Sequence, residues 1–429
     1  MTISIRDTRS AEQYERAVKF LPGGVNSPVR AMRSIGRTPV FIERGSGAEI
    51  VDIDGNHYID WVCSWGPLIH GHAHPEIVAA ITEQAARGTT FGAATVGEVD
   101  LAAELSRRIP SIEMLRMTTS GTEASMSAIR LARAATGRTY LLKFAGAYHG
   151  HVDGLLADAG SGLATQGLPS SPGVLPEAAA QTIVVPWNDP DAVREACAKY
   201  EFAAILVEPY PGNMGVVPPQ EGFLELLRQA ATDNGALLVF DEVISGLRVA
   251  RGGAQELTGV LPDLTILGKI VGGGLPAAAF GGSRELMEQI APVGAVYQAG
   301  TLAGSPLAVA AGLAAVRLLD DSAYLRLAST TDALASGLRD LVGDRPATVQ
   351  SVPGLVTLFF SPTPVTNYDE AKACDQEAYG NFCRGLLARG VYAPPSQFEG
   401  WFPSLAHTPE HLERTLEAAG AALDGAFAG

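Results

Sequence analysis

The sequence predicts an α/β fold built on a mostly parallel β-sheet. Short apolar runs recur along the middle of the chain, each is followed by a Gly-rich or helical segment, and 47% of the 429 residues are hydrophobic. Apolar runs between helical patterns are typical of strands buried on both faces. Strands that alternate with helices favour a parallel sheet, and a chain of this length can bury a large core.

The first 66 residues are expected to form an irregular N-terminal segment. Residues 11–20 have a helical pattern, which two prolines and two glycines interrupt in residues 21–30. Strand-like pieces follow, and Asp54-Gly55 is a hairpin signal. These pieces span residues 39–45, 48–55 and 56–62.

Residues 67–312 are predicted to form a large central domain. A helical pattern with Pro near its start and Gly at its end marks residues 74–88, and further helices are expected at 99–110 and from residue 307. The apolar runs that predict strands span residues 115–120, 139–144, 182–187, 203–209, 236–243 and 263–269.

Residues 313–429 are predicted to form a smaller α+β C-terminal domain. A helix is expected near 322–342 and strands around 349–360. Further helices are expected at 369–390 and 409–427.

Charge and composition exclude several classes of protein. The net charge is −15, which disfavours direct binding to nucleic acid or to an anionic membrane surface. The N-terminus has early charges and no apolar core of a signal peptide, and no apolar stretch is long enough to span a membrane. Four cysteines without a CxxC pair fit a reducing compartment, so we expect a cytoplasmic protein.

Ligands of such sheets bind beyond the carboxyl ends of the strands, and Lys269 stands at one of these ends. It follows an apolar run and precedes a triple-glycine turn. A desolvated lysine can form a Schiff base with a carbonyl compound; the alternative is a surface lysine. A phosphate-binding P-loop is excluded, because the positions that need Gly and Ser or Thr hold Asp263 and Ile270.

Asp241 ends another apolar run. A carboxylate at the end of a buried strand is costly unless it is paired. A cation, a metal ion or a protonated ring nitrogen could serve, and a structural ion pair is the alternative. Glu242 is expected to face the opposite side of the strand.

Two further motifs follow predicted strands. Ser120-Gly121-Thr122 opens a helix, where backbone N–H groups can bind an anion, although Glu123 also makes this an ordinary capping box. Tyr148-His149-Gly150 could place an aromatic ring on a planar cofactor or in the core.

Metal and nicotinamide sites find little support in the sequence. His70, His72 and His74 have a spacing that can bind a metal, but Gly71 and Pro75 indicate a loop and a helix start, and no carboxylate or cysteine accompanies the triplet at ligand spacing. We therefore predict no metal site. The GxGxxG fingerprint of dinucleotide binding is also absent.

The remaining motifs agree with one another. A phosphate cradle, a stacking aromatic, a strand-end acid and a Schiff-base lysine occur in this chain order, all at strand ends. These are the contacts that pyridoxal phosphate needs.

The chain resembles the class III aminotransferases, which are fold-type I pyridoxal-phosphate transferases, over nearly its whole length. Lys269 and DEV at 241–243 are shared across this family. Other motifs point more narrowly to its aminomutase members, which move an amino group within one substrate. These motifs are GGVNSPVRA at 23–31, CSWGP at 63–67, the GSG loop at 160–162 and PPSQFE at 394–399.

The resemblance implies a role for each matching residue. Lys269 is expected to carry the Schiff base and to move protons, Asp241 to pair with the pyridine nitrogen, and Tyr148 to stack on the ring. Cofactor contacts are also implied for Ser120, Gly121, Thr122, His149 and Val243, and for Thr301 from a second subunit. Residues implied to line the substrate pocket are Ser27, Arg30, Trp65, Ser161 and Glu399, with Arg30 binding a substrate carboxylate.

The implied reaction is an internal amino exchange that starts from pyridoxamine phosphate. Glutamate-1-semialdehyde would pass through 4,5-diaminovalerate to 5-aminolevulinate, the tetrapyrrole precursor, under a lid at 160–173. The implied partners are a second copy of the chain and the upstream glutamyl-tRNA reductase, which would hand over the amino-aldehyde substrate.

Departures from the family pattern keep two alternatives open. Ala145 stands where Glu is usual, and the segments 91–94, 241–248 and 304–306 also depart from the family pattern, the second of them at Ile244, Ser245 and Leu247. A transaminase or aminomutase of the same fold that acts on another amino acid therefore stays open. A non-catalytic cofactor-binding protein is disfavoured, because the chain keeps Lys269 and has no spare domain.

Overall fold

A seven-stranded sheet forms the centre of the molecule, with the strand order β4-β10-β9-β8-β7-β5-β6. The computed structural model describes residues 6–157 and 171–427. Five neighbouring strands from β9 to β6 run parallel, and β10 is antiparallel to both of its neighbours. The predicted α/β fold with a mostly parallel sheet is thus confirmed. The strands are β4 (Met114–Thr118), β5 (Tyr140–Phe144), β6 (Thr182–Val185), β7 (Phe202–Val207), β8 (Leu237–Glu242), β9 (Leu264–Leu267) and β10 (Ala278–Gly282).

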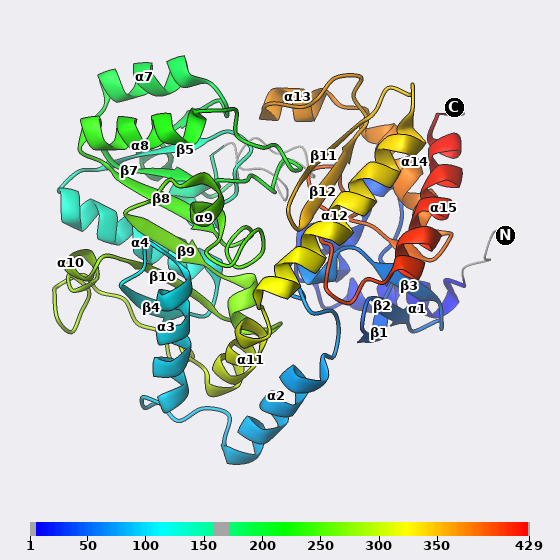
Figure 1. Cartoon of the computed structure of the whole chain (residues 1–429), viewed down its shortest axis with the longest axis horizontal. Helices are drawn as coiled ribbons and strands as arrows, with labels where there is room; N and C mark the ends of the chain where they lie inside the picture. The colour runs from blue at the N-terminus through cyan, green and yellow to red at the C-terminus, as the bar shows by residue number, and fades with distance from the viewer. Residues whose placement is uncertain (1–5, 158–170, 428–429) are drawn as a thin grey trace.

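Helices cover both faces of this sheet (Figure 1). Ile205 and Val207 of β7 pack into the core beneath α7 and α8, whereas Ala204 and Leu206 pack into the core beneath α4. All six residues of β7 are buried, as expected for a strand between two helical layers. The helices of this half are α2 (Pro75–Arg87), α3 (Val96–Arg108), α4 (Gly121–Thr136), α6 (Pro176–Ala179), α7 (Pro190–Lys199), α8 (Phe223–Asn234), α9 (Ala254–Thr258), α10 (Arg284–Met287) and α11 (Pro306–Arg317).

Strand β10 was not among the strands predicted from the sequence. Its residues, AAFGG, are mostly small and have little β propensity. The structure explains the glycines: a Cβ atom at Gly281 would lie 2.7 Å from the Met114 carbonyl oxygen, and one at Gly282 would lie 2.4 Å from that of Asp263. Close approach of the neighbouring backbones therefore requires small residues in this strand.

The N-terminal segment and the C-terminal part of the chain share a second sheet, in the order β1-β2-β3-β13. The predicted hairpin joins β2 to β3, and β13 pairs in parallel with β3. Strands β11 and β12 form a separate hairpin that packs on α12. The strands are β1 (Ile42–Ser46), β2 (Glu49–Asp52), β3 (His57–Asp60), β11 (Thr348–Val352), β12 (Leu355–Phe359) and β13 (Val391–Tyr392). The helices are α1 (Thr8–Ala17), α12 (Asp321–Val342), α13 (Tyr368–Ala373), α14 (Gln376–Leu387) and α15 (Pro409–Ala426).

The first and last helices of the chain, α1 and α15, both lie on this side of the molecule (Figure 1). The division into residues 1–66, 67–312 and 313–429 stays a prediction.

Across the described ranges, no helix combines the length and the apolar character that a membrane crossing needs. Short 3-10 turns at several of the predicted site motifs complete the fold: η1 (Pro22–Gly24), η2 (Pro28–Ala31), η3 (Arg33–Ile35), η4 (Cys63–Trp65), η5 (Asp153–Leu155) and η6 (Lys269–Gly272).

Candidate active site

Lys269 lies just beyond the carboxyl end of β9, at the first position of η6. Its backbone is left-handed, with a φ of 48°, which is uncommon for a residue other than glycine. Burial lowers the pKa of Lys269, and the carboxylates of Glu399, Asp241 and Glu208 oppose this shift, in that order. The lowered pKa favours the neutral amine, which is the form that attacks a carbonyl carbon.

Asp241 and His149 form a buried pair beside this lysine. His149 Nδ1 lies 2.8 Å from Asp241 Oδ2, and the Val243 amide donates to Asp241 Oδ1 over 3.1 Å. His149 Nε2 is buried and has no hydrogen-bond partner among the described residues. An unsatisfied buried nitrogen costs about 1–3 kcal/mol, so a hydrogen-bond partner supplied by a ligand would stabilise this position.

Glu242 faces the opposite side of β8, as predicted. Its carboxylate accepts hydrogen bonds from Ser245 Oγ, the Ala254 amide and Gln255 Nε2, at 3.0, 2.7 and 3.1 Å. Burial raises the pKa of Glu242 to about 7. The two neighbouring acids of the strand therefore have separate surroundings.

We expect Glu242→Gln to remove a pH dependence of stability. Because the folded-state pKa is about 7 and the usual value is 4.5, the folded chain holds a proton that the unfolded chain releases between these values. The free energy of unfolding therefore falls as pH rises through this window and is level above it. Urea unfolding at each pH should show a decline on the order of 3 kcal/mol in the wild type relative to the variant. Parallel curves for the two proteins would contradict this assignment.

The loop after β5 carries Tyr148 and is anchored by two buried charged residues. Glu208 Oε1 accepts a hydrogen bond from the Tyr148 amide over 2.8 Å, and burial raises the pKa of Glu208. Lys143 Nζ donates to the carbonyl oxygens of Ala147 and Leu155 over 3.2 and 3.1 Å. Lys143 was not predicted as a site residue. Glu208 directly follows an apolar run, at a strand end where the sequence places ligand chemistry, but no role was predicted for it.

The start of α4 has the predicted capping box, and its binding of an anion stays a prediction. Ser120 Oγ accepts from the Glu123 amide over 3.3 Å, and Glu123 Oε2 accepts from the Ser120 amide over 3.1 Å, so the capping box is present. Thr122 Oγ1 lies 3.1 Å from His151 Nδ1. A Cβ atom at Gly150 would lie 2.6 Å from Thr122 Oγ1, which places the Tyr148 loop directly against this helix start.

Val243 joins three of the motifs. A Cβ atom at Gly121 would lie 3.3 Å from one Val243 methyl group, and one at Gly268 would lie 3.2 Å from the other. The helix start, the end of β8 and the residue before Lys269 are therefore in contact around one side chain. The structure thus brings the predicted cofactor residues of one chain to a single edge of the sheet.

The turn that contains Trp65 lies against the lysine. Cys63, Ser64 and Trp65 all have positive φ angles, of 46°, 57° and 68°. A Cβ atom at Gly66 would lie 3.3 Å from Lys269 Cδ. Residues held in this backbone region persist only where the surrounding structure fixes them, which is common at ligand-binding sites.

The other predicted substrate residues have fewer contacts that connect them to Lys269. Glu399 is buried and acts electrostatically on both Lys269 and Tyr148. Ser27 precedes η2 and is half-buried, and Arg30 within η2 is exposed. The following turn, η3, is held to the segment before Glu399 by a hydrogen bond from Ser34 to the Pro395 carbonyl. Among the contacts of the described residues, none joins Arg30 to Lys269.

The structure does not test the roles of two further predicted site residues. Ser161 lies outside the described residues, as does the part of the predicted lid at 160–170. Thr301 is exposed in the turn before α11. Its implied contact with a second subunit is not tested by a single chain.

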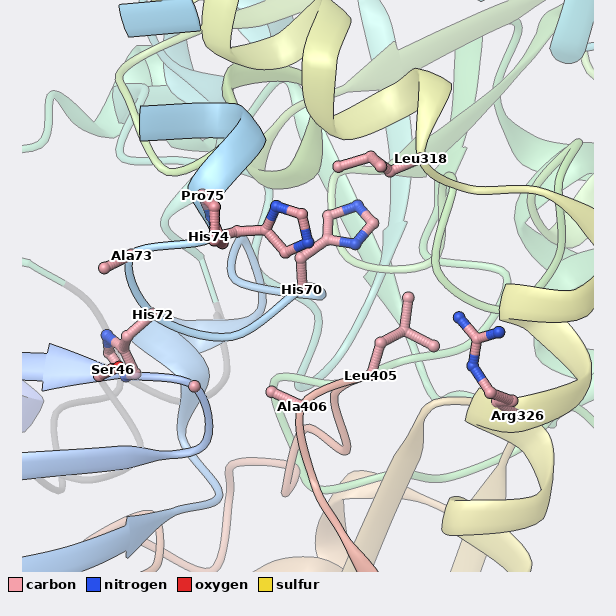
Figure 2. Close-up of a pocket in the computed structure, with 11 residues that line it drawn as sticks. Ser46, His70, His72, Ala73, His74, Pro75, Leu318, Arg326, Leu405 and Ala406 are labelled. Atoms are coloured by element: carbon pink, nitrogen blue, oxygen red, sulfur yellow. The ribbon is translucent and has the colours of Figure 1, made fainter. Parts of the chain in front are cut away.

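The three histidines of the HxHxH motif line a separate cavity of about 450 Å³ (Figure 2). His70 Nε2 lies 2.8 Å from the Ala315 carbonyl oxygen, and His72 Nε2 lies 2.7 Å from Asp60 Oδ2. In the part of the chain that the structure describes, no group of three or more His, Cys, Asp or Glu residues is arranged to hold a metal ion.

Comparison with known proteins identifies the family. The model of the aminotransferase class-III family matches residues 31–422. The chain belongs to the class III aminotransferases. Among the relatives of this class III aminotransferase, glutamate-1-semialdehyde 2,1-aminomutase 2 of Brevibacillus brevis is 54% identical over 98% of this chain and 99% of the relative. The glutamate-1-semialdehyde 2,1-aminomutase of Thermomicrobium roseum is 53% identical over 96% of this chain and 97% of the relative.

Solved structures of similar proteins include both transaminases and an aminomutase. An omega-transaminase from Sphaerobacter thermophilus superposes on this class III aminotransferase with a TM-score of 0.90, at 35% identity over 97% of both chains. A glutamate-1-semialdehyde aminomutase from Pseudomonas aeruginosa gives a TM-score of 0.87 at 29% identity, over 98% of this chain and 95% of the other. A structure described as a transaminase with PLP bound gives a TM-score of 0.89 at 33% identity, over 99% of both chains. The fold-type I resemblance is confirmed.

Proposed function

We propose that this class III aminotransferase is a glutamate-1-semialdehyde 2,1-aminomutase, which converts glutamate-1-semialdehyde to 5-aminolevulinate for tetrapyrrole synthesis. The observation that carries the proposal is the convergence of Lys269, Asp241 and Glu399 on one site. This site occurs in a chain that is 54% identical, end to end, to a protein with that name. No external amino donor is consumed in such a reaction.

Pyridoxal phosphate and pyridoxamine phosphate are the proposed cofactors, and the described residues fit them. Asp241 is buried at a strand end, where its carboxylate can hold a protonated ring nitrogen. The unpartnered Nε2 of His149 supplies a further polar contact. The first amides of α4, at Gly121 and Thr122, have no acceptor within their own helix and suit a phosphate group. When bound, the cofactor withdraws electrons from the carbon that carries the amino group.

The residues of the chain hold the reactants and move the protons. As the neutral amine, Lys269 can take a proton from the substrate carbon that loses its amino group, and as the ammonium ion it can give a proton to the neighbouring carbon that receives one. Tyr148 is half-buried and supplies the aromatic ring beside Asp241. Glu208 fixes the backbone of Tyr148, and the strained turn at Trp65 restricts the space next to Lys269. This arrangement supports exchange of an amino group between two adjacent carbons.

Arg30 is proposed to bind the substrate carboxylate, and Arg30→Ala should therefore raise KM with little change in kcat. The expected increase is about tenfold to a hundredfold, because a hydrogen bond between charged groups contributes about 1.5–3 kcal/mol. Steady-state kinetics with glutamate-1-semialdehyde would measure it. Arg33→Ala, in the next exposed turn, is the matched control. An unchanged KM for Arg30→Ala would exclude Arg30 from this role.

A product assay tests the function itself. Purified protein loaded with pyridoxamine phosphate is given glutamate-1-semialdehyde without any amino donor or acceptor, and 5-aminolevulinate is measured by mass spectrometry. Many turnovers per subunit are expected. A single turnover that resumes only when a donor or a 2-oxo acid is added would contradict the aminomutase assignment.

A transaminase is the second candidate function. It is favoured by the structural similarity to the omega-transaminase, whose identity of 35% exceeds the 29% of the solved aminomutase. It is also favoured by Ala145, which stands where the aminomutase pattern usually has Glu. The same assay separates the two functions, since only a transaminase depends on the added donor or acceptor.

A homodimer is the proposed assembly, with Thr301 reaching the cofactor site of the second subunit. Large apolar side chains are exposed around this residue and on α3, among them Tyr297 at 71% and Val96 at 78%. Exposed apolar groups gathered in this way mark protein interfaces. Sedimentation should give twice the chain mass of 44.7 kDa, and a monomer at micromolar concentration would contradict the proposal.

Substrate transfer from a glutamyl-tRNA reductase and a cytoplasmic location are proposed with this function. The four cysteines are free thiols, which supports a reducing compartment. If the reductase hands its product over directly, a reagent that traps free glutamate-1-semialdehyde should leave the formation of 5-aminolevulinate by the two enzymes together largely intact. Complete inhibition by the trap would contradict direct hand-over.

A further inference from the structure

Arg248 is a buried cation held by backbone carbonyl groups. It is 1% exposed, and among the described residues it forms no ion pair. Its guanidinium donates to the carbonyl oxygens of Gly354 and Pro403 over 3.2 and 3.0 Å, and also to that of Gly66. The ring of Phe402 lies 5.2 Å from the guanidinium carbon. These partners come from three segments that are far apart in the sequence.

One of these partners lies directly against the catalytic lysine. Gly66 ends the turn with three positive φ angles, and a Cβ atom there would lie 2.9 Å from Phe402 as well as 3.3 Å from Lys269 Cδ. Arg248 therefore fixes both the carbonyl group of Gly66 and the ring that packs against it. A left-handed turn of non-glycine residues needs such contacts, because each residue costs about 1–3 kcal/mol.

The charge of Arg248 also reaches Lys269. Burial is the largest cause of the lowered pKa of Lys269, and the positive charge of Arg248 adds to it. The three carboxylates around Lys269 act in the opposite direction. The fixed positive charge of Arg248 therefore opposes the effect of the carboxylates.

We propose that Arg248 is a positioning residue for Lys269. Its guanidinium holds the Trp65–Gly66 turn against the lysine side chain through the carbonyl group of Gly66 and the ring of Phe402. This inference rests on the proposed function, because it assigns Arg248 to the same site. A lysine at position 248 would keep the charge but could not reach three carbonyl groups at once.

Two variants distinguish the effect of the positive charge of Arg248 from the effect of its hydrogen bonds to the carbonyl groups. In full-length protein without cofactor, Lys269 is acetylated briefly at a series of pH values, and its labelling is measured by peptide mass spectrometry. Arg248→Met should move the labelling midpoint to higher pH, because the variant loses the positive charge near Lys269. Arg248→Lys should keep the midpoint close to the wild-type value but raise KM by about tenfold. Arg251→Met is the matched control, because this neighbouring arginine pairs with Asp321 at the surface and should leave both quantities unchanged.

A wild-type midpoint in folded Arg248→Met, or a wild-type KM in Arg248→Lys, would overturn the proposal. Circular dichroism establishes whether each variant folds, and Arg248→Lys decides the case if Arg248→Met does not. The labelling needs neither substrate nor turnover. A wild type that labels as expected but makes no 5-aminolevulinate would therefore contradict the proposed function and leave the role of Arg248 standing.

Discussion

Lys269→Ala should lower kcat by at least about a thousandfold while the protein still binds its cofactor. The variant loses the amine that bonds to the cofactor and moves protons, and positioned proton transfer alone contributes about 10²–10⁴ to a rate. The start of α4 and Asp241 remain, so the contacts proposed for the phosphate and the ring nitrogen are kept. The product assay measures kcat, and absorbance after gel filtration measures the retained cofactor.

Lys199→Ala is the control for this experiment. Lys199 ends α7, is exposed and pairs only loosely with Glu195, at 3.8 Å. Its loss should change neither kcat nor cofactor binding. Normal turnover by Lys269→Ala would show that another group performs the chemistry.

Asp241→Asn should lower kcat by about a thousandfold, which is the second large effect. A neutral amide cannot hold a protonated ring nitrogen, so the cofactor loses most of its capacity to withdraw electrons. The change is nearly isosteric, and the hydrogen bond from the Val243 amide can be kept. The measurements are kcat and the absorbance spectrum of the bound cofactor, which should respond to pH differently from the wild type.

Glu242→Gln is the matched control for Asp241→Asn. The two residues are neighbours on β8, but Glu242 faces Ser245 and Gln255 rather than the site. We expect kcat to remain within a few-fold of the wild type in this control. If kcat of Asp241→Asn also remained within a few-fold of the wild type, Asp241 would be excluded from the proposed role.

The parts of the fold that local patterns encode could be predicted from the sequence. The runs at 203–209 and 236–243 predicted β7 and β8, because strands between two helical layers are apolar over most of their length. Strand β10 could not be predicted in this way. Its small residues are required by the backbones on either side of it, and those neighbours are known only from the folded chain.

The same distinction applies to the candidate site. Lys269 and Asp241 each end a recognisable run, so their positions at the sheet edge followed from the sequence. Glu208 also ends a run, but its contact is with the amide of Tyr148, 60 residues earlier. Arg248 has no local signal at all, because its three carbonyl partners are set by tertiary structure.

The pairing of β13 with β3 bears on how the enzyme is made. During synthesis, β3 must wait for a partner about 330 residues downstream, because Ile59 and Asp60 pair with Val391 and Tyr392. The segment that carries Glu399 follows directly. Long-range pairing of this kind is slow, and domains fold as units while the chain leaves the ribosome. The central sheet can therefore form early, whereas the segment of Glu399, which is proposed to line the substrate pocket, is added last, after nearly the whole chain has been translated.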